Sequence, residues 1–567
     1  MTKAQIYQPL KNERPQHKKA SSIKHKRSRR RRKVGLADRR ASLKADALQS
    51  TIGDFGRWQM GIALAVAMSG LPGAWFKIGI VFLAPPVDFW CTSPLPADHN
   101  ATARYKCTVP GPGEDGATVP CESWEYDRSV FTETIITEWD LVCHRAQLAN
   151  VVQMLFMFGF LVGCTVGGVV ADKYGRKPPL LWGSVLMLLA GVGCALVPWF
   201  CAYLALRFLS AVAVGAITVT GFVLTIEIIG GRWRTPVNAL SGLPFSVGHC
   251  MLAGLAYLMR DWHHLQLAVS IPVVLQLSYV WLVPESPRWL IAVGREHEAV
   301  EVLKKGASAN RIPVADWDKV LAACREGQQK GGDEQEQSAG FLALFRTPVM
   351  RRCTLVMYAN WAACGLVFYG LVQYMGQVAG NIFLNGFLSG VLEMPGMVIC
   401  CVSLIRWGRR KTLLAAQVCT GVSCLSIMLV PLLGLPDWVT VALASCGVTG
   451  MSVAFPCVYI YAAELFPTVV RNIGVGSAST IARVGSMMAP FVATLNSVSL
   501  CLPPLFFGLV PLAAGLLVYM LPETLHRELP DTIAEVENWE NSAVMKTKDN
   551  APAVVGEENP TFTTESS

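Results

Sequence analysis

The stretch GGVVADKYGRKPPLL at residues 167–181 places four charged side chains within six residues, between two apolar segments. These side chains are Asp172, Lys173, Arg176 and Lys177. Segments of about 20 residues with few or no charges recur on both sides of the stretch, and a helix needs this length to cross a bilayer. A short charged loop between two such segments is typical of a membrane protein whose helices follow one another across the lipid.

The composition of the whole chain agrees with this interpretation. Of its 567 residues, 52% are hydrophobic and only 16% are charged, whereas a soluble domain is about a quarter charged. We therefore predict an all-α polytopic membrane protein with twelve transmembrane helices. The predicted spans are 58–83, 147–171, 179–199, 201–226, 236–258, 264–283, 353–373, 381–404, 412–433, 437–461, 472–497 and 502–521. A cleaved signal peptide is not expected, because the first apolar segment is too long and follows a long charged N-terminus.

Basic residues orient the predicted helices. Residues 1–50 hold 16 Lys and Arg against 3 acidic residues and show no helical period, so we predict a disordered cytoplasmic tail. Later basic loops return to the same side, which places both termini in the cytoplasm. Beside a membrane, the run KRSRRRRK (26–33) favours anionic lipid head groups over nucleic acid. The alternative is that it acts only as a topology signal.

The predicted extracellular loop, residues 85–146, has the opposite charge bias, with ten acidic residues against four Lys and Arg. It contains Cys91, Cys107, Cys121 and Cys143, and four cysteines in an oxidising exterior allow three disulfide connectivities. The triplet NAT at Asn100 is a glycosylation acceptor. These features favour the plasma membrane.

Three motifs occur in both parts of the chain at matching positions. DKYGRK (172–177) is echoed by IRWGRRK (405–411), TIEIIGGRWR (225–234) by AAELFPTVVR (462–471), and LVPESPRWL (282–290) by LPETLHREL (521–529). Such a repeat predicts two pseudo-symmetric halves of six helices, as in transporters of the major facilitator type. The predicted organisation is a tail (1–50), a first half (51–283), a cytoplasmic loop (284–350), a second half (351–521) and a second tail (522–567).

The repeated charges predict gating contacts on the cytoplasmic face. Asp172 can cap the next helix, and we expect Arg176 to pair with Glu464 across the halves in one state of the transporter. The full set of predicted gating residues is Asp172, Arg176, Glu227, Arg232, Glu464 and Arg471. The alternative is a plain positive loop that only orients the helices. Ile405 stands where the second copy would need its aspartate, which weakens the prediction for that half.

Further stretches show a resemblance to one family. They are GDFGRWQ (53–59), VFLAPPVDFWC (81–91), WEYDRSVFTETIITEWDLVC (124–143), GGVVADKYGRK (167–177), RFLSA (207–211), PESPRWL (284–290), YGL (369–371), LEMPG (392–396), ELFPTVVRNIGVG (464–476) and PETLHRELPDT (522–532). Over residues 50–535 the chain resembles the organic ion transporters of solute carrier family 22, in the major facilitator superfamily. The resemblance implies alternating access around a central cavity and a small organic cation, anion or zwitterion as substrate.

Ionisable residues within spans are candidate functional groups. Glu393 can attract an amine or carry a proton, or pair with a Lys or Arg. The position of Arg483 is an aspartate in typical organic cation carriers of the family, and an arginine in its anion and carnitine-type carriers. Lys77 is a further candidate, although it can instead snorkel to the bilayer surface. Arg207 and His249 are more typical of structural partners.

Aromatic residues complete the predicted binding site. Tyr369 and Tyr459 are the preferred candidates, because a cation over an aromatic ring gains about 0.5–2 kcal/mol. With Glu393 and Arg483, they favour a zwitterion resembling carnitine or a β-amino acid. The alternatives are an organic cation, an organic anion, and a receptor that does not transport. Since phosphate-loop, HExxH and nucleotide-binding motifs are absent, we expect no enzyme and no cofactor or metal. The expected partners are the bilayer, the substrate and a coupling Na⁺ or H⁺.

Overall fold

The computed structural model describes residues 52–93, 105–110, 118–230, 233–313, 317, 340–378, 380–467, 469–525, 527, 530 and 532–537. In this part of the chain, ten helices are long and apolar enough to cross a membrane. Two more helices, α23 (Arg471–Thr494) and α24 (Leu502–Val518), occupy the last two predicted positions. The first is less apolar because Ser and Thr residues and Arg483 interrupt it, and the second is short at 17 residues. Together they complete the twelve-helix fold.

The first half contains helices from residue 57 to residue 282. They are α3 (Arg57–Ala67), α4 (Gly70–Ile78), α5 (Ile80–Leu83), α7 (Gln147–Tyr174), α8 (Lys177–Leu196), α9 (Phe200–Ile228), α10 (Arg234–Leu240), α11 (Leu243–Leu258), α12 (Trp262–Ser270), η3 (Ile271–Ser278) and α13 (Tyr279–Leu282). The first predicted span is thus divided into α3, α4 and α5. The sixth changes from α-helix to 3-10 helix where Pro272 removes a backbone donor.

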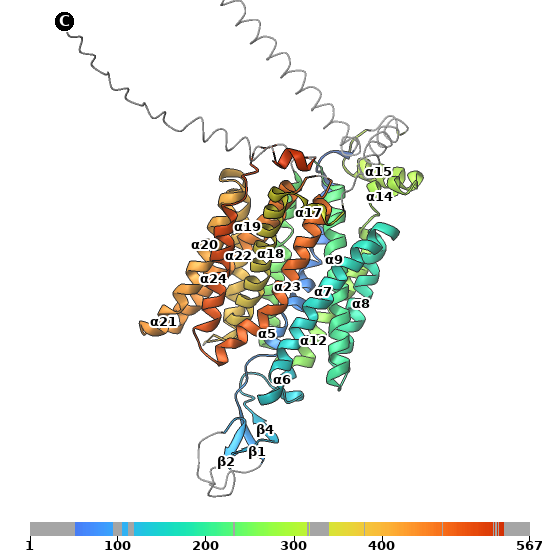
Figure 1. Cartoon of the computed structure of the whole chain (residues 1–567). Coiled ribbons are helices and arrows are strands. Elements are labelled where there is room, and N and C mark those ends of the chain that lie inside the picture. The colour runs from blue at the N-terminus through green and yellow to red at the C-terminus, as the bar shows by residue number, and fades with distance from the viewer. Residues whose placement is uncertain are drawn as a thin grey trace, which may run out of the picture.

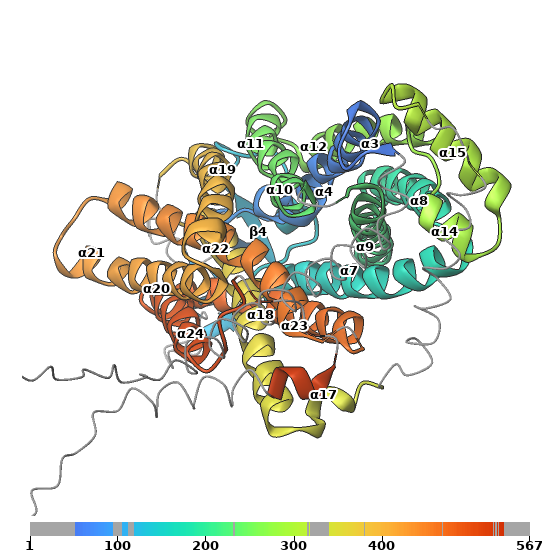
Figure 2. The same ribbon diagram turned by 90° about the horizontal axis from the view of Figure 1, so that it is seen from above.

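A linker leads to the second half, and its described residues include further helices. The linker helices are α14 (Pro287–Ala292), α15 (Glu296–Ala309) and α17 (Ala343–Arg346). The second half contains α18 (Pro348–Met375), α19 (Ile382–Arg406), α20 (Arg409–Ile427), α21 (Leu429–Leu432), α22 (Asp437–Leu465), α23, η4 (Leu495–Ser497) and α24. Seen from above, α18, α20, α22 and α24 gather on one side, and α7, α8 and α9 on the other (Figure 2).

The two ends of the bundle differ. α14, α15 and α17 lie at one end, which we call the linker end, and the β-strands lie at the other, the strand end (Figure 1). The strands form two antiparallel pairs, and α6 and η1 follow them. The elements are β1 (Phe89–Ser93) with β4 (Ser123–Tyr126), β2 (Thr108–Pro110) with β3 (Thr118–Pro120), α6 (Ile135–Glu138) and η1 (Cys143–Arg145).

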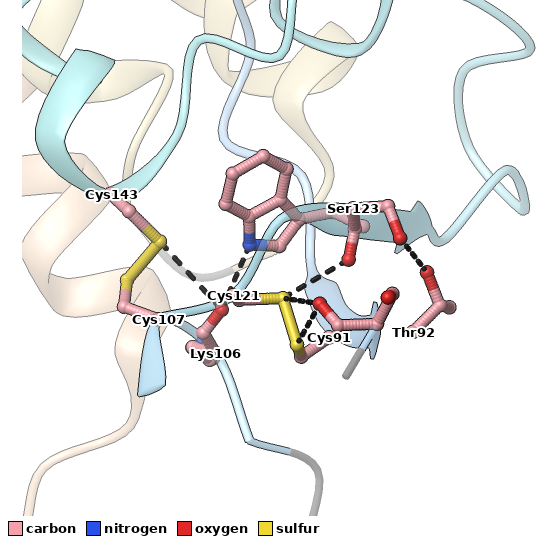
Figure 3. The surroundings of a disulfide bond; sticks show 9 residues. Cys91, Thr92, Lys106, Cys107, Cys121, Ser123 and Cys143 are labelled. Carbon is pink, nitrogen blue, oxygen red and sulfur yellow. Dashed lines mark hydrogen bonds between the residues drawn. A yellow bond between two sulfur atoms is a disulfide. The ribbon is translucent and has the colours of Figure 1, made fainter. Parts of the chain in front are cut away.

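Disulfides hold this strand-bearing loop together. Cys91 is joined to Cys121, and Cys107 to Cys143, which is one of the three connectivities that four cysteines allow (Figure 3). The second bond ties the loop to the start of α7. Asn100 lies outside the described residues, and its glycosylation stays a prediction.

The loop is attached to the first half through the start of α12. The backbone N–H of Thr132 donates to the carbonyl of Arg260 at 3.0 Å, and that of Trp262 donates to the carbonyl of Glu133 at 3.1 Å. Its contact with the second half is made by Phe131, whose ring centroid lies 5.3 Å from that of Phe383. The loop is therefore built onto the first half and touches the second.

Within the first half, glycines allow α7 and α9 to pack closely. Gly159, Gly163 and Gly167 lie four residues apart on α7, against the α9 backbone around Phe208, Val212 and Ala216. A Cβ at Gly163 would overlap the carbonyl oxygen of Val212, so only glycine fits there. Small residues at this spacing are a common way for membrane helices to approach one another.

Candidate functional site

A cavity of about 1300 Å³ lies between the two halves. Its lining comes from both halves and runs from Glu393, in the middle of α19, to Arg471 and Thr524 at the linker end. Toward the strand end the halves are in contact, since the rings of Phe82 and Phe383 stack with centroids 6.0 Å apart. The structure therefore shows the cavity open toward the linker end.

All five residues predicted to bind substrate line this cavity. They are Lys77, Tyr369, Glu393, Tyr459 and Arg483. Each comes from a different helix, namely α4, α18, α19, α22 and α23. The fold thus brings together side chains that are far apart in the sequence, with more than 400 residues between Lys77 and Arg483. Their role in binding remains a prediction.

Two cationic side chains, Lys77 and Arg483, approach the ring of Phe160 on α7. The Lys77 Nζ is 4.5 Å from the ring centroid and the Arg483 guanidinium carbon is 4.4 Å from it. Both residues are buried, with 8% and 7% of their surface exposed, so Lys77 does not snorkel to the bilayer surface. Within the described residues neither forms an ion pair with a carboxylate. Two buried basic groups without a carboxylate partner favour the binding of an anion beside them.

Glu393 has a partner in the other half. Its Oε1 lies 2.7 Å from the Nδ1 of His249 on α11, and both residues are 1% exposed. Its second oxygen, Oε2, is buried and has no hydrogen-bond partner among the described residues. A buried carboxylate oxygen without a hydrogen-bond partner destabilises the folded protein. It can therefore accept a hydrogen bond from a ligand in the cavity.

Aromatic rings surround the site of Arg483. The Tyr459 ring centroid lies 4.2 Å from that of Trp361, and the rings of Phe455 and Tyr459 stack at 6.2 Å. Arg483 Nη2 is 3.5 Å from the Tyr459 hydroxyl oxygen. Tyr369 meets Phe368 edge to face at 5.3 Å. These rings give the cavity an apolar wall beside its few charges.

At the linker end of the first half, Arg176 is held by several acidic groups. Its guanidinium lies 2.7 Å from Glu227 and 3.1 Å from Asp172. Glu285 accepts the backbone N–H groups of Arg176 and Lys177 at 2.7 and 3.1 Å. Burial alone would lower the pKa of Arg176, but hydrogen bonds to Glu227 raise the pKa above its ordinary value, so the pair stays charged.

The second half repeats this arrangement with different residues. Arg409 lies 2.7 Å from Glu464, and Glu523 accepts the backbone N–H groups of Arg409 and Arg410 at 2.9 and 3.1 Å. Arg176 and Glu464 are therefore not paired with each other in this state, and their pairing in a state closed at the linker end stays a prediction. With the cavity open at the linker end, each arginine pairs with a glutamate of its own half.

The other predicted gating residues have separate environments. Arg471 lines the cavity and donates to the carbonyl groups of Phe466 and Pro530, at 3.2 and 3.4 Å. Arg232 lies outside the described residues.

Several residues of the site were not predicted. Arg409 follows Gly408 as Arg176 follows Gly175, and Glu285 and Glu523 share a Pro-Glu motif, so the repeat contained the signal for all three. The contact of His249 with Glu393 had no such signal, because 144 residues separate them. Phe160 resembles any other apolar residue of its helix.

Comparisons with known proteins agree with this architecture. Residues 115–534 match the model of the family described as "Sugar (and other) transporter". The chain is also similar to solved structures of the xylose transporter XylE from E. coli. One, in an inward open conformation, aligns with a TM-score of 0.61 and 16% sequence identity over 85% of this chain and 99% of that one. At this identity the likeness shows the fold.

Curated relatives are more similar in sequence. An organic cation transporter protein from Drosophila melanogaster is 33% identical over 520 residues, which is 87% of this chain and 94% of that protein. Solute carrier family 22 member 3 from Rattus norvegicus is 32% identical over 86% of this chain and 95% of its own length. Member 6-A from Xenopus laevis is 36% identical over 74% of this chain and 75% of its own length. The chain belongs to solute carrier family 22 of the major facilitator superfamily, and it is a multi-pass membrane transporter of organic ions and not an enzyme.

Proposed function

We propose that the chain carries a small zwitterion, resembling carnitine or a β-amino acid, across the plasma membrane by alternating access. One observation carries this proposal: the buried cations Lys77 and Arg483 meet at Phe160 without an acidic partner among the described residues. The carboxylate of the substrate would bind there, since an arginine can hold a carboxylate through two parallel hydrogen bonds.

The positive group of the substrate would bind at Glu393. The unpartnered Oε2 supplies the acceptor, and Tyr369 lines the same cavity. A cation beside aromatic rings gains about 0.5–2 kcal/mol when it leaves water, which adds to the attraction of the carboxylate. A site that binds a positive and a negative group at once selects a zwitterion over a simple cation or anion.

An organic anion is the second candidate. It is favoured by the pairing of Glu393 with His249, which leaves Lys77 and Arg483 as the groups without a counter-ion. The relative from Drosophila melanogaster is named an organic cation transporter protein, which makes a cation the remaining outcome to test.

The orientation in the membrane is part of the proposal. Basic residues gather at the linker end and disulfides at the strand end, which supports a cytoplasmic linker end and an extracellular strand end. Both termini would then be cytoplasmic, with the basic N-terminal tail near anionic lipid. The gating role of Arg176, Glu227, Glu464 and Arg471 is supported by their place at the linker end, where Glu464 and Arg471 line the cavity.

Uptake in oocytes tests the proposal with four probes: β-alanine, carnitine, tetraethylammonium and glutarate. We expect Arg483→Gln and Lys77→Gln to raise the KM for β-alanine by about tenfold to a hundredfold, since a hydrogen bond to a charged group contributes about 1.5–3 kcal/mol. Tetraethylammonium uptake should not fall in these variants. Lys305→Gln is the matched control, because Lys305 is an exposed lysine on α15.

The outcomes separate the candidates. Uptake of β-alanine that depends on Arg483 and on Glu393 supports the zwitterion. Uptake of glutarate that depends on Arg483 but is unchanged in Glu393→Gln would favour an organic anion as the substrate in place of the zwitterion. Uptake of tetraethylammonium alone, unchanged by Arg483→Gln, would contradict both and assign Arg483 a structural role. Surface expression without uptake of any probe would favour a receptor.

A further inference from the structure

We propose that the His249–Glu393 pair binds a proton that the transporter exchanges for the ammonium group of its substrate. This inference rests on the proposed function, because it assigns Glu393 to the positive end of a zwitterion. It adds a coupling ion and the place where that ion binds.

The pair lies where the two halves touch. His249 is on α11 in the first half and Glu393 is on α19 in the second, and 2.7 Å separates Nδ1 from Oε1. Gly390 brings the helices together one turn away: a Cβ there would come within 2.8 Å of the Cys250 backbone nitrogen and 3.2 Å of the His249 Cβ. Both members of the pair are also 1% exposed. Any movement that separates α11 from α19 must break this contact.

The protonation state sets the charge of the pair. With a neutral imidazole the pair carries one negative charge, and with an imidazolium it is neutral. Burying an unbalanced charge is unfavourable, so a buried pair is better accommodated when it holds the extra proton. Imidazole is the side chain that can gain and lose this proton near neutral pH.

Other titratable groups face the pair from the surrounding helices. Cys250 on α11 and Tyr369 on α18 interact electrostatically with Glu393. Lys77 from α4, Tyr459 from α22 and Arg483 from α23 line the same cavity. The two cations oppose protonation of His249 in the unloaded site, whereas Glu393 favours it from direct contact at 2.7 Å. The ammonium group would instead contact Glu393 directly, so it has the stronger effect on the pair.

The second oxygen of Glu393 offers the site at which the ammonium group of the substrate can bind. Oε2 of Glu393 is buried and has no hydrogen-bond partner among the described residues, so an ammonium group can bind there while Oε1 still contacts His249. The site would then hold two positive groups and one carboxylate. The imidazolium restores neutrality by releasing one N–H proton to water, and no other bond breaks. Substrate entry from one side thus releases a proton to that side, and a proton from the other side rebinds after the substrate leaves.

The test uses the purified full chain in liposomes, with a pH-sensitive dye in the lumen and the membrane potential clamped. β-Alanine is added outside. We expect its uptake to raise the lumenal pH, and a lumen one pH unit more acidic than the outside to increase accumulation by up to about tenfold. Any uptake of β-alanine that remains in His249→Gln should occur without proton movement or dependence on the gradient, because an amide can donate to Glu393 but cannot carry the proton. His264→Gln is the matched control, because the His264 side chain is 69% exposed.

Each result decides between the proposals. Uptake of β-alanine by the wild type without a change in lumenal pH would overturn the exchange and leave the zwitterion function standing. Proton movement that persists in His249→Gln would remove this pair as its site. No uptake by the wild type at any pH would overturn both. If His249→Gln does not yield folded protein, His249→Asn provides the same readout with a shorter amide.

Discussion

At the scale of single residues, two glycines explain why both halves carry the same charged turn. Gly175 and Gly408 have φ angles of +101° and +86°, a conformation that glycine adopts without strain. The space where a Cβ would stand is occupied by the carboxylates of Glu285 and Glu523. Each carboxylate can therefore reach the backbone N–H groups of the two residues that follow the glycine.

Replacing these glycines should destabilise the protein for two reasons. We expect Gly175→Ala or Gly408→Ala to lower the free energy of unfolding by about 1–3 kcal/mol, through backbone strain and loss of the carboxylate contact. Gly294→Ala separates the two effects, because Gly294 has a φ of +78° but no atom within 4 Å of the added Cβ. Thermal unfolding in detergent should then show a smaller loss for Gly294→Ala. Equal losses in all three variants would leave strain as the whole cause.

The sequence predicted the charged turn but not every partner in it. The repeat identified Arg176 and Glu464, and the structure pairs Arg176 with Glu227 and Arg409 with Glu464. The sequence shows which charged residues are available to form ion pairs in the two turns. Which of them meet depends on whether the halves are together or apart at that end.

At the scale of helices, close packing of α7 on α9 depends on space at particular positions of one helix face. Gly163 abuts the α9 backbone, whereas a Cβ at the nearby Gly168 would meet no atom within 4 Å. The two positions are on the same helix and in the same apolar segment. Substitutions at Gly163 and Gly168 therefore distinguish the effect of close packing from the effect of helix propensity.

We expect Gly163→Ala to destabilise the first half, because α7 and α9 would have to move apart. The cost should be about 1–3 kcal/mol, as for other overpacked sites. Gly168→Ala should be neutral or slightly stabilising, since alanine is the better helix former by about 1 kcal/mol. Fluorescence-detected size-exclusion chromatography after heating would measure both. A Gly168→Ala variant as unstable as Gly163→Ala would contradict this view of the interface.

Helix positions were well predicted because long apolar segments are constrained by bilayer thickness. The breaks within helices were not predicted. The first span ends α3 at Ala67 and begins α4 at Gly70, and the sixth continues as 3-10 helix after Ser270. These changes preserve the apolar composition, so a hydrophobicity pattern does not detect them.

At the scale of the whole molecule, contacts between the halves keep the strand end closed. The Asn150 side-chain nitrogen on α7 donates to the hydroxyl of Thr494 on α23 at 3.0 Å. The aromatic contact of Phe82 with Phe383 lies at the same end. These contacts must separate if the cavity is to open toward the strands.

Cross-linking this end should therefore stop transport. In an Asn150→Cys and Thr494→Cys double variant, a short bis-methanethiosulfonate, which attaches to both thiols through disulfide bonds, should abolish uptake, and a reductant should restore it. The single variants are the controls, because the chain has 18 cysteines of its own. Uptake that continues after complete cross-linking would show that α7 and α23 need not separate during the cycle.

The two halves and the location of the cavity followed from the repeat and the intramembrane charges. The direction of its opening did not, because the same twelve helices build every state of the cycle. Membrane proteins of this type change the contacts between their halves and keep the helices themselves. Only the placement of residues such as Phe82 and Thr494 identifies the state.

The disulfide-bonded loop at the strand end has one more consequence. It is anchored to the start of α12 and projects away from the bundle, while α21 projects from the other half (Figure 1). A projecting body fixed to one half acts as a pointer, because a rotation of that half displaces the tip farther than it displaces the helix ends. Spin labels on β4 and on α21 would thus convert a small rocking angle into a measurable change of distance. The conformational cycle could therefore be followed with labels on these two projecting elements, without a label in the substrate pathway.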